Sequence, residues 1–244
     1  MTLYLSRVTL ARSPATTALK ALIDPVERSA GDRLHDPARG RIMDAHHRLI
    51  WALFADSSDC NRDFLWRAEG SGRFLILSSR LPGADGAGLF LPPESKSFAP
   101  DLRAGDRLSF VLRANATRTR RVAPGIRAQR VDVVMDAIHA LPSGRDSDAR
   151  RETRMAAAAA AGRDWLARQG EAAGFEVTDF AAADYSVVPL PSHLGSRKGQ
   201  PQFGVIEMAG RLSVREPQAL LGQIPKGFGR AKAFGCGLML IRRA

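Results

Sequence analysis

Hydrophobic and polar residues recur along this chain with two different periods, and each period predicts one type of element. Alternation at every second position predicts a strand over residues 2–11, and a polar, irregular stretch follows up to Gly40. Apolar residues then recur at helical spacing, which predicts a helix over about residues 42–54. Two short apolar runs, residues 64–66 and 74–77, flank a glycine-rich turn and predict a hairpin.

The same patterns continue through the rest of the chain. A strand is predicted over residues 108–114, and the arginine-rich residues 113–130 predict an exposed boundary. Beyond it, strands are predicted over residues 131–135, 175–180, 185–190, 203–214 and 238–241, and helices over about 148–173 and 217–224.

The order of these elements predicts the fold class. Each half begins with a strand, a helix and further strands and ends on a strand, which is typical of the ferredoxin-like arrangement; the second helix of the first half is weak or replaced. We therefore expect an α+β protein of two tandem ferredoxin-like (RRM-like) domains with antiparallel sheets. The predicted domains are residues 1–122, with the first helix, and residues 123–244.

The net charge of the chain indicates which class of molecule it binds. The 244 residues include 36 Lys plus Arg against 25 Asp plus Glu, a formal net charge of +11. A folded, strongly basic protein most often binds a polyanion, and nucleic acid is the commonest one. Most of the cations are arginines. Planar guanidinium groups suit RNA, but a GC-rich genome would also enrich arginine, and we weigh the two explanations equally.

Several classes of protein are excluded. Cys60 and Cys236 stand alone and far apart, which argues against a disulfide framework or a zinc site. No run reaches the roughly 20 apolar residues of a membrane span. The first residues lack the basic start and long apolar stretch of a signal peptide. We therefore expect a soluble, cytoplasmic protein that binds no membrane.

Two adjacent histidines in the first predicted helix are candidates for chemistry. A helical wheel places His46 on the apolar side and His47 at its edge, with Asp44 and Arg48 toward solvent. Adjacent helical residues point about 100° apart, so the pair does not suit a shared metal ion. His47 beside Arg48 offers a proton-transfer group and a cation, which metal-free RNA cleavage needs. The alternative is a core His46 and a surface His47 without function.

A glycine-rich basic segment near the C-terminus is the second candidate. It has no Gly-Lys-Ser/Thr and no third glycine of a dinucleotide fingerprint, so no nucleotide cofactor is expected. Its cations and phenylalanines favour the backbone of a polynucleotide, although a mobile turn is the alternative. The candidate RNA-binding residues of this segment are Lys226, Gly227, Gly229, Arg230, Lys232, Gly235 and Gly237.

A third cluster follows the strand predicted over residues 108–114. A charge run is usually a solvated face, so this cluster alone is a weak signal. Its candidate RNA-binding residues are Arg113, Asn115, Arg118, Arg120 and Arg121.

Together these features resemble the CasE family, the CRISPR repeat endoribonucleases of the type I-E Cascade complex. The resemblance covers nearly the whole chain. It rests on His47-Arg48 ahead of Trp51 and Leu53, on residues 3–8, 64–67, 112–115 and 165–166, and most specifically on the paired glycines of residues 227–237.

The resemblance implies a function as well as a fold. Members bind the hairpin of precursor CRISPR RNA and cut at the 3′ base of its stem without metal, leaving a 2′,3′-cyclic phosphate and a 5′-hydroxyl. The essential histidine carries over onto His47, and Arg48 would stabilise charge or orient the phosphate. Arg197 and Lys198 match the position of a basic hairpin placed against the RNA stem. Mature CRISPR RNA and other Cascade subunits are the implied partners.

One residue differs from the pattern of the family, and this difference leaves two alternative functions open. Asp44 stands where members commonly have a tyrosine, and a carboxylate that is ionised at neutral pH cannot be the same proton donor. The chain therefore has a second interpretation as a non-catalytic subunit that binds the repeat hairpin. A third is a nonspecific basic protein, whose binding would show the steep salt dependence of phosphate contacts.

Overall fold

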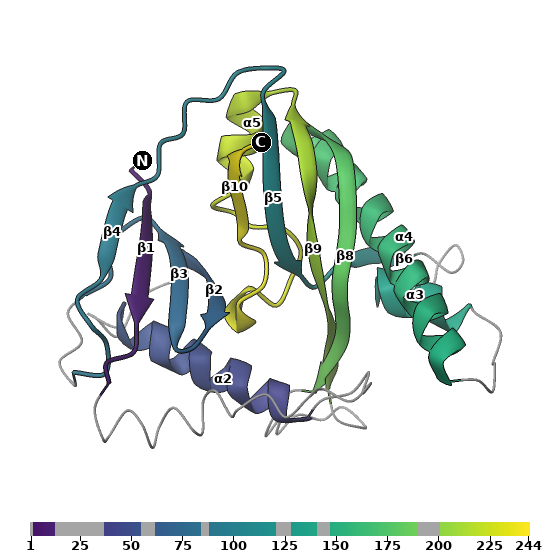
Figure 1. Cartoon of the computed structure of the whole chain (residues 1–244), viewed down its shortest axis with the longest axis horizontal. Helices are drawn as coiled ribbons and strands as arrows, with labels where there is room; N and C mark the ends of the chain where they lie inside the picture. The colour runs from purple at the N-terminus through teal and green to yellow at the C-terminus, as the bar shows by residue number, and fades with distance from the viewer. Residues whose placement is uncertain are drawn as a thin grey trace.

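Two four-stranded antiparallel sheets lie side by side in the computed structural model of the chain (Figure 1). It describes residues 2–12, 37–54, 62–83, 88–120, 128–140, 147–189 and 201–244. In spatial order, the first sheet contains β2 (Phe64–Gly70), β3 (Arg73–Ser78), β1 (Tyr4–Thr9) and β4 (Glu94–Ser97). The second contains β10 (Met239–Arg243), β5 (Arg107–Ala114), β9 (Gln202–Val214) and β8 (Phe175–Pro189).

Each sheet has the strand order of a ferredoxin-like unit. In the first, β1 and β2 both pair with β3, and β4 pairs with the outer edge of β1. In the second, β5 and β8 both pair with β9, and β10 pairs with β5. A helix follows the first strand of each unit, α2 (Pro37–Ala52) or α4 (Ser147–Ala173), and α5 (Pro217–Gln223) precedes β10. The predicted fold of two tandem ferredoxin-like units with antiparallel sheets is therefore confirmed.

The strand predicted over residues 108–114 belongs to the second sheet. We expected it to close the first unit, but its whole length pairs with β9 and β10, so this assignment is wrong. The fourth strand of the first unit is β4, which is short, polar and exposed and has no hydrophobic pattern to predict it. Strand pairing thus separates the two sheets between Ser97 and Arg107, while the domain division after residue 122 stays a prediction.

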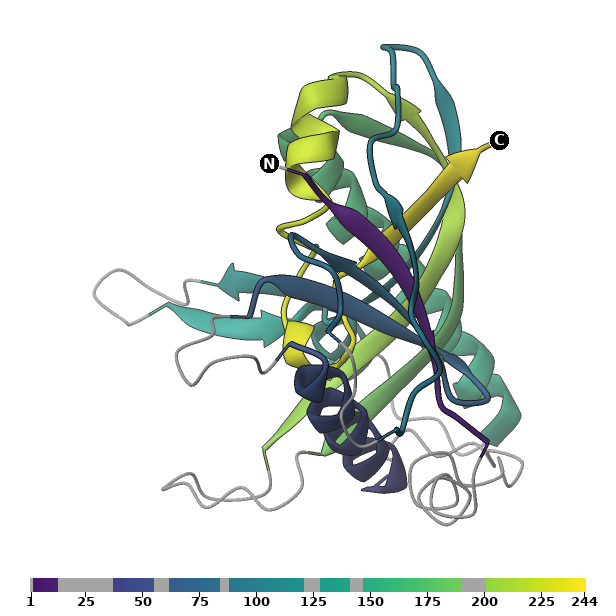
Figure 2. The same ribbon diagram turned by 90° about the vertical axis from the view of Figure 1, so that its left-hand side faces the viewer.

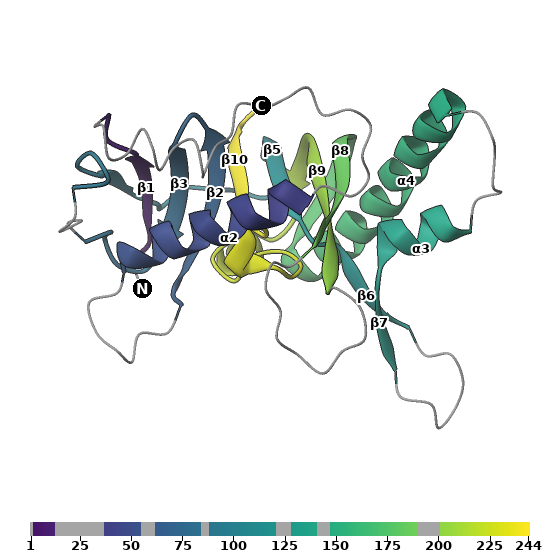
Figure 3. The same cartoon turned by 90° about the horizontal axis from the view of Figure 1, so that it is seen from below.

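The core of the first unit lies between α2 and one face of its sheet. Ile50 of α2 is fully buried against aromatic side chains of the strands, among them Phe64, Trp66 and Phe74. Seen from below in Figure 3, α2 extends from the first sheet across to the strands of the second. The helix is therefore positioned to carry residues to the junction of the two units.

The core of the second unit extends into the first. Leu166 of α4 and Leu112 of β5 are fully buried in it, and Leu65 and Leu77 of the first sheet belong to the same cluster of buried residues. At roughly 25 cal/mol per Å² of apolar surface buried, such shared burial favours a fixed arrangement of the two units.

A two-stranded hairpin of β6 (Thr117–Arg120) and β7 (Gln129–Asp132) projects from this body (Figure 2). The strand predicted over residues 131–135 ends early, because the Asp132 side chain accepts hydrogen bonds from the amides of Val134 and Met135 and begins helix α3 (Val133–His139).

The strands predicted over residues 175–180 and 185–190 form one strand, β8. Register shifts near Val177 and Ala182 keep it paired with β9 through the polar stretch between the two apolar runs. Most of the irregular stretch predicted before Gly40 lies outside the described residues, and α2 already begins at Pro37.

Candidate active site

The two neighbouring histidines of α2 have different surroundings. His46 is 8% exposed, and its ring meets those of Trp66 and Phe74 edge-on, with centroid distances of 6.1 and 4.9 Å. His47 is only half-buried. The predicted division, with His46 on the apolar side of the helix and His47 at its edge, is confirmed.

His47 lies where α2 meets residues 226–237, which we call the glycine loop. The His47 ring centroid is 6.1 Å from that of Trp51 on the same helix and 6.2 Å from that of Phe234 in the loop. Phe234 ends a short 3-10 turn, η1 (Lys232–Phe234), which contacts both α2 and β2. The two candidate segments, far apart in sequence, therefore meet at His47.

Charged groups surround this position. Asp44 and Arg48 form an ion pair one helical turn apart, with an N–O distance of 3.0 Å. The Arg48 side chain is 79% exposed. Arg62, two residues before β2, is also exposed and lies near enough to act on His47 electrostatically. No motif in the sequence marks Arg62 as a candidate site residue.

The pKa of His47 is lowered from its ordinary value of 6.5. Partial burial is the largest cause, and the positive charges of Arg62 and Arg48 act in the same direction, while Asp44 opposes them. The neutral imidazole therefore predominates at pH 7. A neutral imidazole can accept a proton, which is the first requirement of a general base.

The glycine loop needs glycine for steric reasons. Gly227, Gly229, Gly235 and Gly237 have φ of 74°, 73°, 72° and 95°, in the left-handed region. A Cβ atom on Gly229 would lie 2.6 Å from the carbonyl oxygen of Asn115, and one on Gly235 would lie 2.9 Å from the Trp66 ring. The loop is thus packed closely against β2 and the end of β5, and the described structure does not support the alternative of a mobile turn.

Several amides of the loop donate hydrogen bonds within the protein. The Phe228 amide donates to the Gly237 carbonyl at 2.9 Å, and the Gly237 amide donates to the Arg113 carbonyl at 2.7 Å. The Arg230 amide donates to the Asn115 carbonyl at 3.1 Å. These amides are therefore not available to a phosphate, and contact of the loop glycines with RNA stays a prediction.

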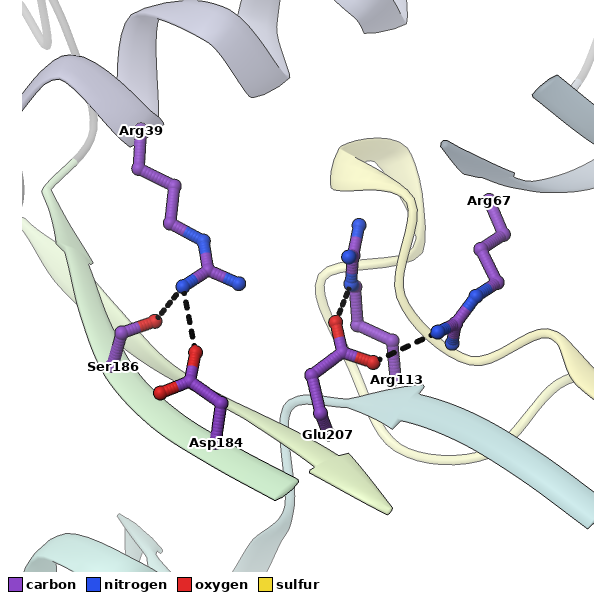
Figure 4. A network of polar contacts seen from close by, with 6 residues as sticks. All are labelled: Arg39, Arg67, Arg113, Asp184, Ser186 and Glu207. Atoms are coloured by element: carbon purple, nitrogen blue, oxygen red, sulfur yellow. Dashed lines mark hydrogen bonds and ion pairs between the residues drawn. The ribbon is translucent and has the colours of Figure 1, made fainter. Parts of the chain in front are cut away.

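Glu207 of β9 links the two units (Figure 4). Its carboxylate accepts a hydrogen bond from Nη2 of Arg67 on β2 at 2.9 Å and another from Nε of Arg113 on β5. All three side chains are at most 19% exposed. Arg113 was predicted to bind RNA, but its guanidinium is engaged in this link, so we do not include it in the proposed RNA surface.

A second link holds α2 to the other unit. Arg39, near the start of α2, donates from Nη1 to the Asp184 carboxylate at 3.0 Å and to the Ser186 hydroxyl at 2.6 Å, both on β8 (Figure 4). Because α2 carries His47, this link and the Glu207 link together fix the histidine relative to the second unit.

The remaining predicted residues fall into four groups. Asn115 is 5% exposed and donates to the Gly204 carbonyl at 2.8 Å, so its role is structural. Arg118 and Arg120 lie on β6 away from α2, and both pair with Asp136, at 2.5 and 2.8 Å. The exposed cations of the glycine loop are Lys226 and Arg230, and Lys232 is half-buried. Arg121, Arg197 and Lys198 lie outside the described residues.

The described residues contain no group of three or more His, Cys, Asp or Glu side chains that could hold a metal ion. Cys236 is buried with a free thiol, and Cys60 lies outside the described ranges. No helix in the described part of the chain is long and apolar enough to cross a membrane.

Known proteins resemble this chain in sequence and in fold. The CRISPR-associated endoribonuclease Cse3 of Thermus thermophilus is 26% identical over 239 residues, which cover 91% of this chain and 97% of Cse3. The Cascade subunit CasE of Escherichia coli is 26% identical over 209 residues, covering 79% of this chain and 88% of CasE. A structure of Cse3 bound to a 19-nucleotide RNA superposes with a TM-score of 0.62 at 22% identity, and 99% of each chain is covered.

A profile of the family described as CRISPR associated protein matches residues 3–243 of the chain. The match spans both ferredoxin-like units, including α2 with His47 and the glycine loop. The chain therefore belongs to this family of CRISPR associated proteins, the CasE family.

Proposed function

We propose that this protein is a metal-independent endoribonuclease that binds the hairpin of the CRISPR repeat and cleaves precursor CRISPR RNA at the 3′ base of the stem. The endoribonuclease name of the Thermus relative and the net charge of +11 both support RNA as the substrate. The observation that carries the proposal is His47 of α2, a half-buried imidazole with a lowered pKa that lies against Phe234 of the glycine loop.

The nucleophile of the proposed reaction is a hydroxyl group of the RNA itself and not a water molecule. His47 accepts the proton of the 2′-hydroxyl next to the scissile phosphate, and the 2′-oxygen forms a bond to phosphorus. The bond from phosphorus to the 5′-oxygen breaks, and that oxygen takes up a proton from the solvent, to which His47 afterwards releases the proton it accepted. The products are a 2′,3′-cyclic phosphate and a 5′-hydroxyl.

Negative charge develops on the phosphoryl oxygens during this exchange, and nearby cations stabilise it. Arg48 is one such group, although Asp44 already balances part of its charge. Asp44 itself is an ion-paired carboxylate and does not suit the role of proton donor. The carboxylate thus favours a second candidate function, a subunit that binds the hairpin without cutting it.

We assign RNA binding first to the exposed cations of the glycine loop, the segment that meets α2 at His47. Lys226 and Arg230 of the glycine loop are exposed and can track a phosphate backbone. Arg197 and Lys198 remain proposed contacts to the stem of the hairpin. Arg118, Arg120 and Arg121 remain proposed contacts to the RNA. The relative CasE is named as a Cascade subunit, which supports the further proposal that this protein is also a Cascade subunit. In that role it would stay bound to the RNA it has cut.

The test uses end-labelled repeat RNA from the CRISPR array of the source genome, in excess EDTA, with mapping of the product ends. We expect one cut at the 3′ base of the stem and a cyclic phosphate on the upstream product. A matched RNA with a single 2′-deoxynucleotide before the cut should bind equally well and stay intact. Tight binding without any cut would support the non-catalytic subunit instead.

A further inference from the structure

The cations near His47 differ in how far acidic groups balance them. Arg48 is paired with Asp44, and Arg80, close to the start of β2, is paired with Asp63 at 3.0 Å. Arg62 lies directly before Asp63, is exposed, and has no carboxylate partner in the described part of the chain. A charge without a partner next to a candidate active site is available to an anion.

The structure brings the start of β2 to the histidine. Phe64, two residues after Arg62, packs on Trp51 with ring centroids 5.5 Å apart, and Trp51 in turn lies beside His47. On the other side, η1 contacts β2, and Gly235 packs against Trp66. Arg62 therefore lies at the place where α2, the start of β2 and the glycine loop converge.

Two titratable groups from different elements respond to the charge of Arg62. It lowers the pKa of His47 on α2 and also that of Lys232 on the glycine loop, in each case after the larger effect of burial. Lys232 is held in place by a hydrogen bond from its Nζ to the Lys226 carbonyl. The positive charges of Arg62 and Lys232 repel each other, and Arg62 disfavours the protonated form of His47. A bound phosphate would offset both effects.

We propose that Arg62 is a phosphate-binding residue of this active site, which holds the scissile phosphate between His47 and Lys232 and stabilises its charge during cleavage. The proposal rests on the proposed function and adds to it a residue outside the helix and the glycine loop. A guanidinium suits this task because it presents several donors in a fixed plane to the phosphoryl oxygens and stays charged at all relevant pH values.

The test compares single-turnover cleavage of the repeat RNA by the parent protein, Arg62→Gln and Arg62→Lys. We expect Arg62→Gln to slow cleavage by about 100-fold, the effect of losing one donor to a developing oxyanion. Its affinity for the 2′-deoxy RNA should fall far less, and Arg62→Lys should restore part of the rate. The control Arg73→Gln, an exposed arginine at the start of β3, should cleave like the parent.

The outcomes separate the two proposals. If the parent cuts the RNA and Arg62→Gln cuts it within threefold of the same rate, the role of Arg62 is refuted and the endoribonuclease stands. If the parent cuts nothing, both proposals fail. An equal loss of RNA affinity and cleavage rate in Arg62→Gln, without any rescue by lysine, would also overturn the role, because it would indicate a folding defect or general binding.

Discussion

His47 of α2 and Phe234 of the glycine loop lie with their ring centroids 6.2 Å apart, although they come from opposite ends of the chain. This contact joins the candidate proton-transfer group to the segment that carries Lys232. We predict that Phe234→Ala slows single-turnover cleavage by roughly 10- to 100-fold, because small displacements of a catalytic group are costly. Phe234 is half-buried and also packs on Phe203, so the midpoint of thermal unfolding should fall modestly, and the cleavage rates are compared well below it. Unchanged cleavage would show that the loop does not position the histidine.

The pKa of His47 gives a prediction with a definite sign. Burial, Arg62 and Arg48 lower it and Asp44 raises it, so the midpoint of an NMR titration of the His47 ring should lie below 6.5. Asp44→Asn should move the midpoint further down, and Arg48→Gln should move it up. A general base must be neutral, so the cleavage rate should rise with pH through this midpoint and then level off. A midpoint above 6.5 would contradict the described surroundings.

Glu207 is predicted to hold the two units together. Glu207→Ala leaves the guanidinium groups of Arg67 and Arg113 without their carboxylate in a largely buried site, which should cost about 3 to 5 kcal/mol of unfolding free energy. The matched control is Asp136→Ala, whose partners Arg118 and Arg120 are about half exposed, and which should cost roughly 1 kcal/mol or less. Urea denaturation measures both. Equal losses would refute the prediction that the Glu207 link contributes more to stability than an exposed ion pair.

Gly229 is predicted to be irreplaceable in the glycine loop. Its φ of 73° and the 2.6 Å approach of the Asn115 carbonyl leave no room for a methyl group. Gly229→Ala should therefore destabilise the protein by about 1 to 3 kcal/mol. Gly222→Ala is the control, because Gly222 lies in α5 with nothing within 4 Å of an added Cβ. A tolerated Gly229→Ala would mean that the loop is less tightly packed than described.

Sequence periodicity predicted the fold well where hydrophobic side chains make one face of an element. The α2 wheel separated His46 from His47 because burial follows the 3.6-residue period. The pattern failed at β4, which pairs with β1 through the backbone and through polar side chains such as Ser95 and carries no apolar alternation. It also failed at β5, whose partner sheet depends on long-range pairing that no local pattern encodes.

The candidate site was predictable only in part. Motif spacing identified His47 and the glycine loop separately, and it is the structure that brings them together. The roles of Arg113 and Asn115 could not be predicted, because a basic or polar residue at a strand end looks the same in sequence whether it meets RNA or a buried carboxylate. A role for Arg62 could not be predicted from the sequence at all. Its position near His47 depends on how α2, β2 and the glycine loop pack together.

The most direct test of the central claim is the single-turnover rate of repeat RNA cleavage in EDTA by the parent, His47→Ala and the control His139→Ala. His139 is an exposed histidine on α3, away from the glycine loop. We predict that His47→Ala binds the RNA but loses at least about 100-fold in rate, as expected for removal of a general base, while His139→Ala cleaves like the parent. Cleavage by His47→Ala at the parental rate would contradict the account.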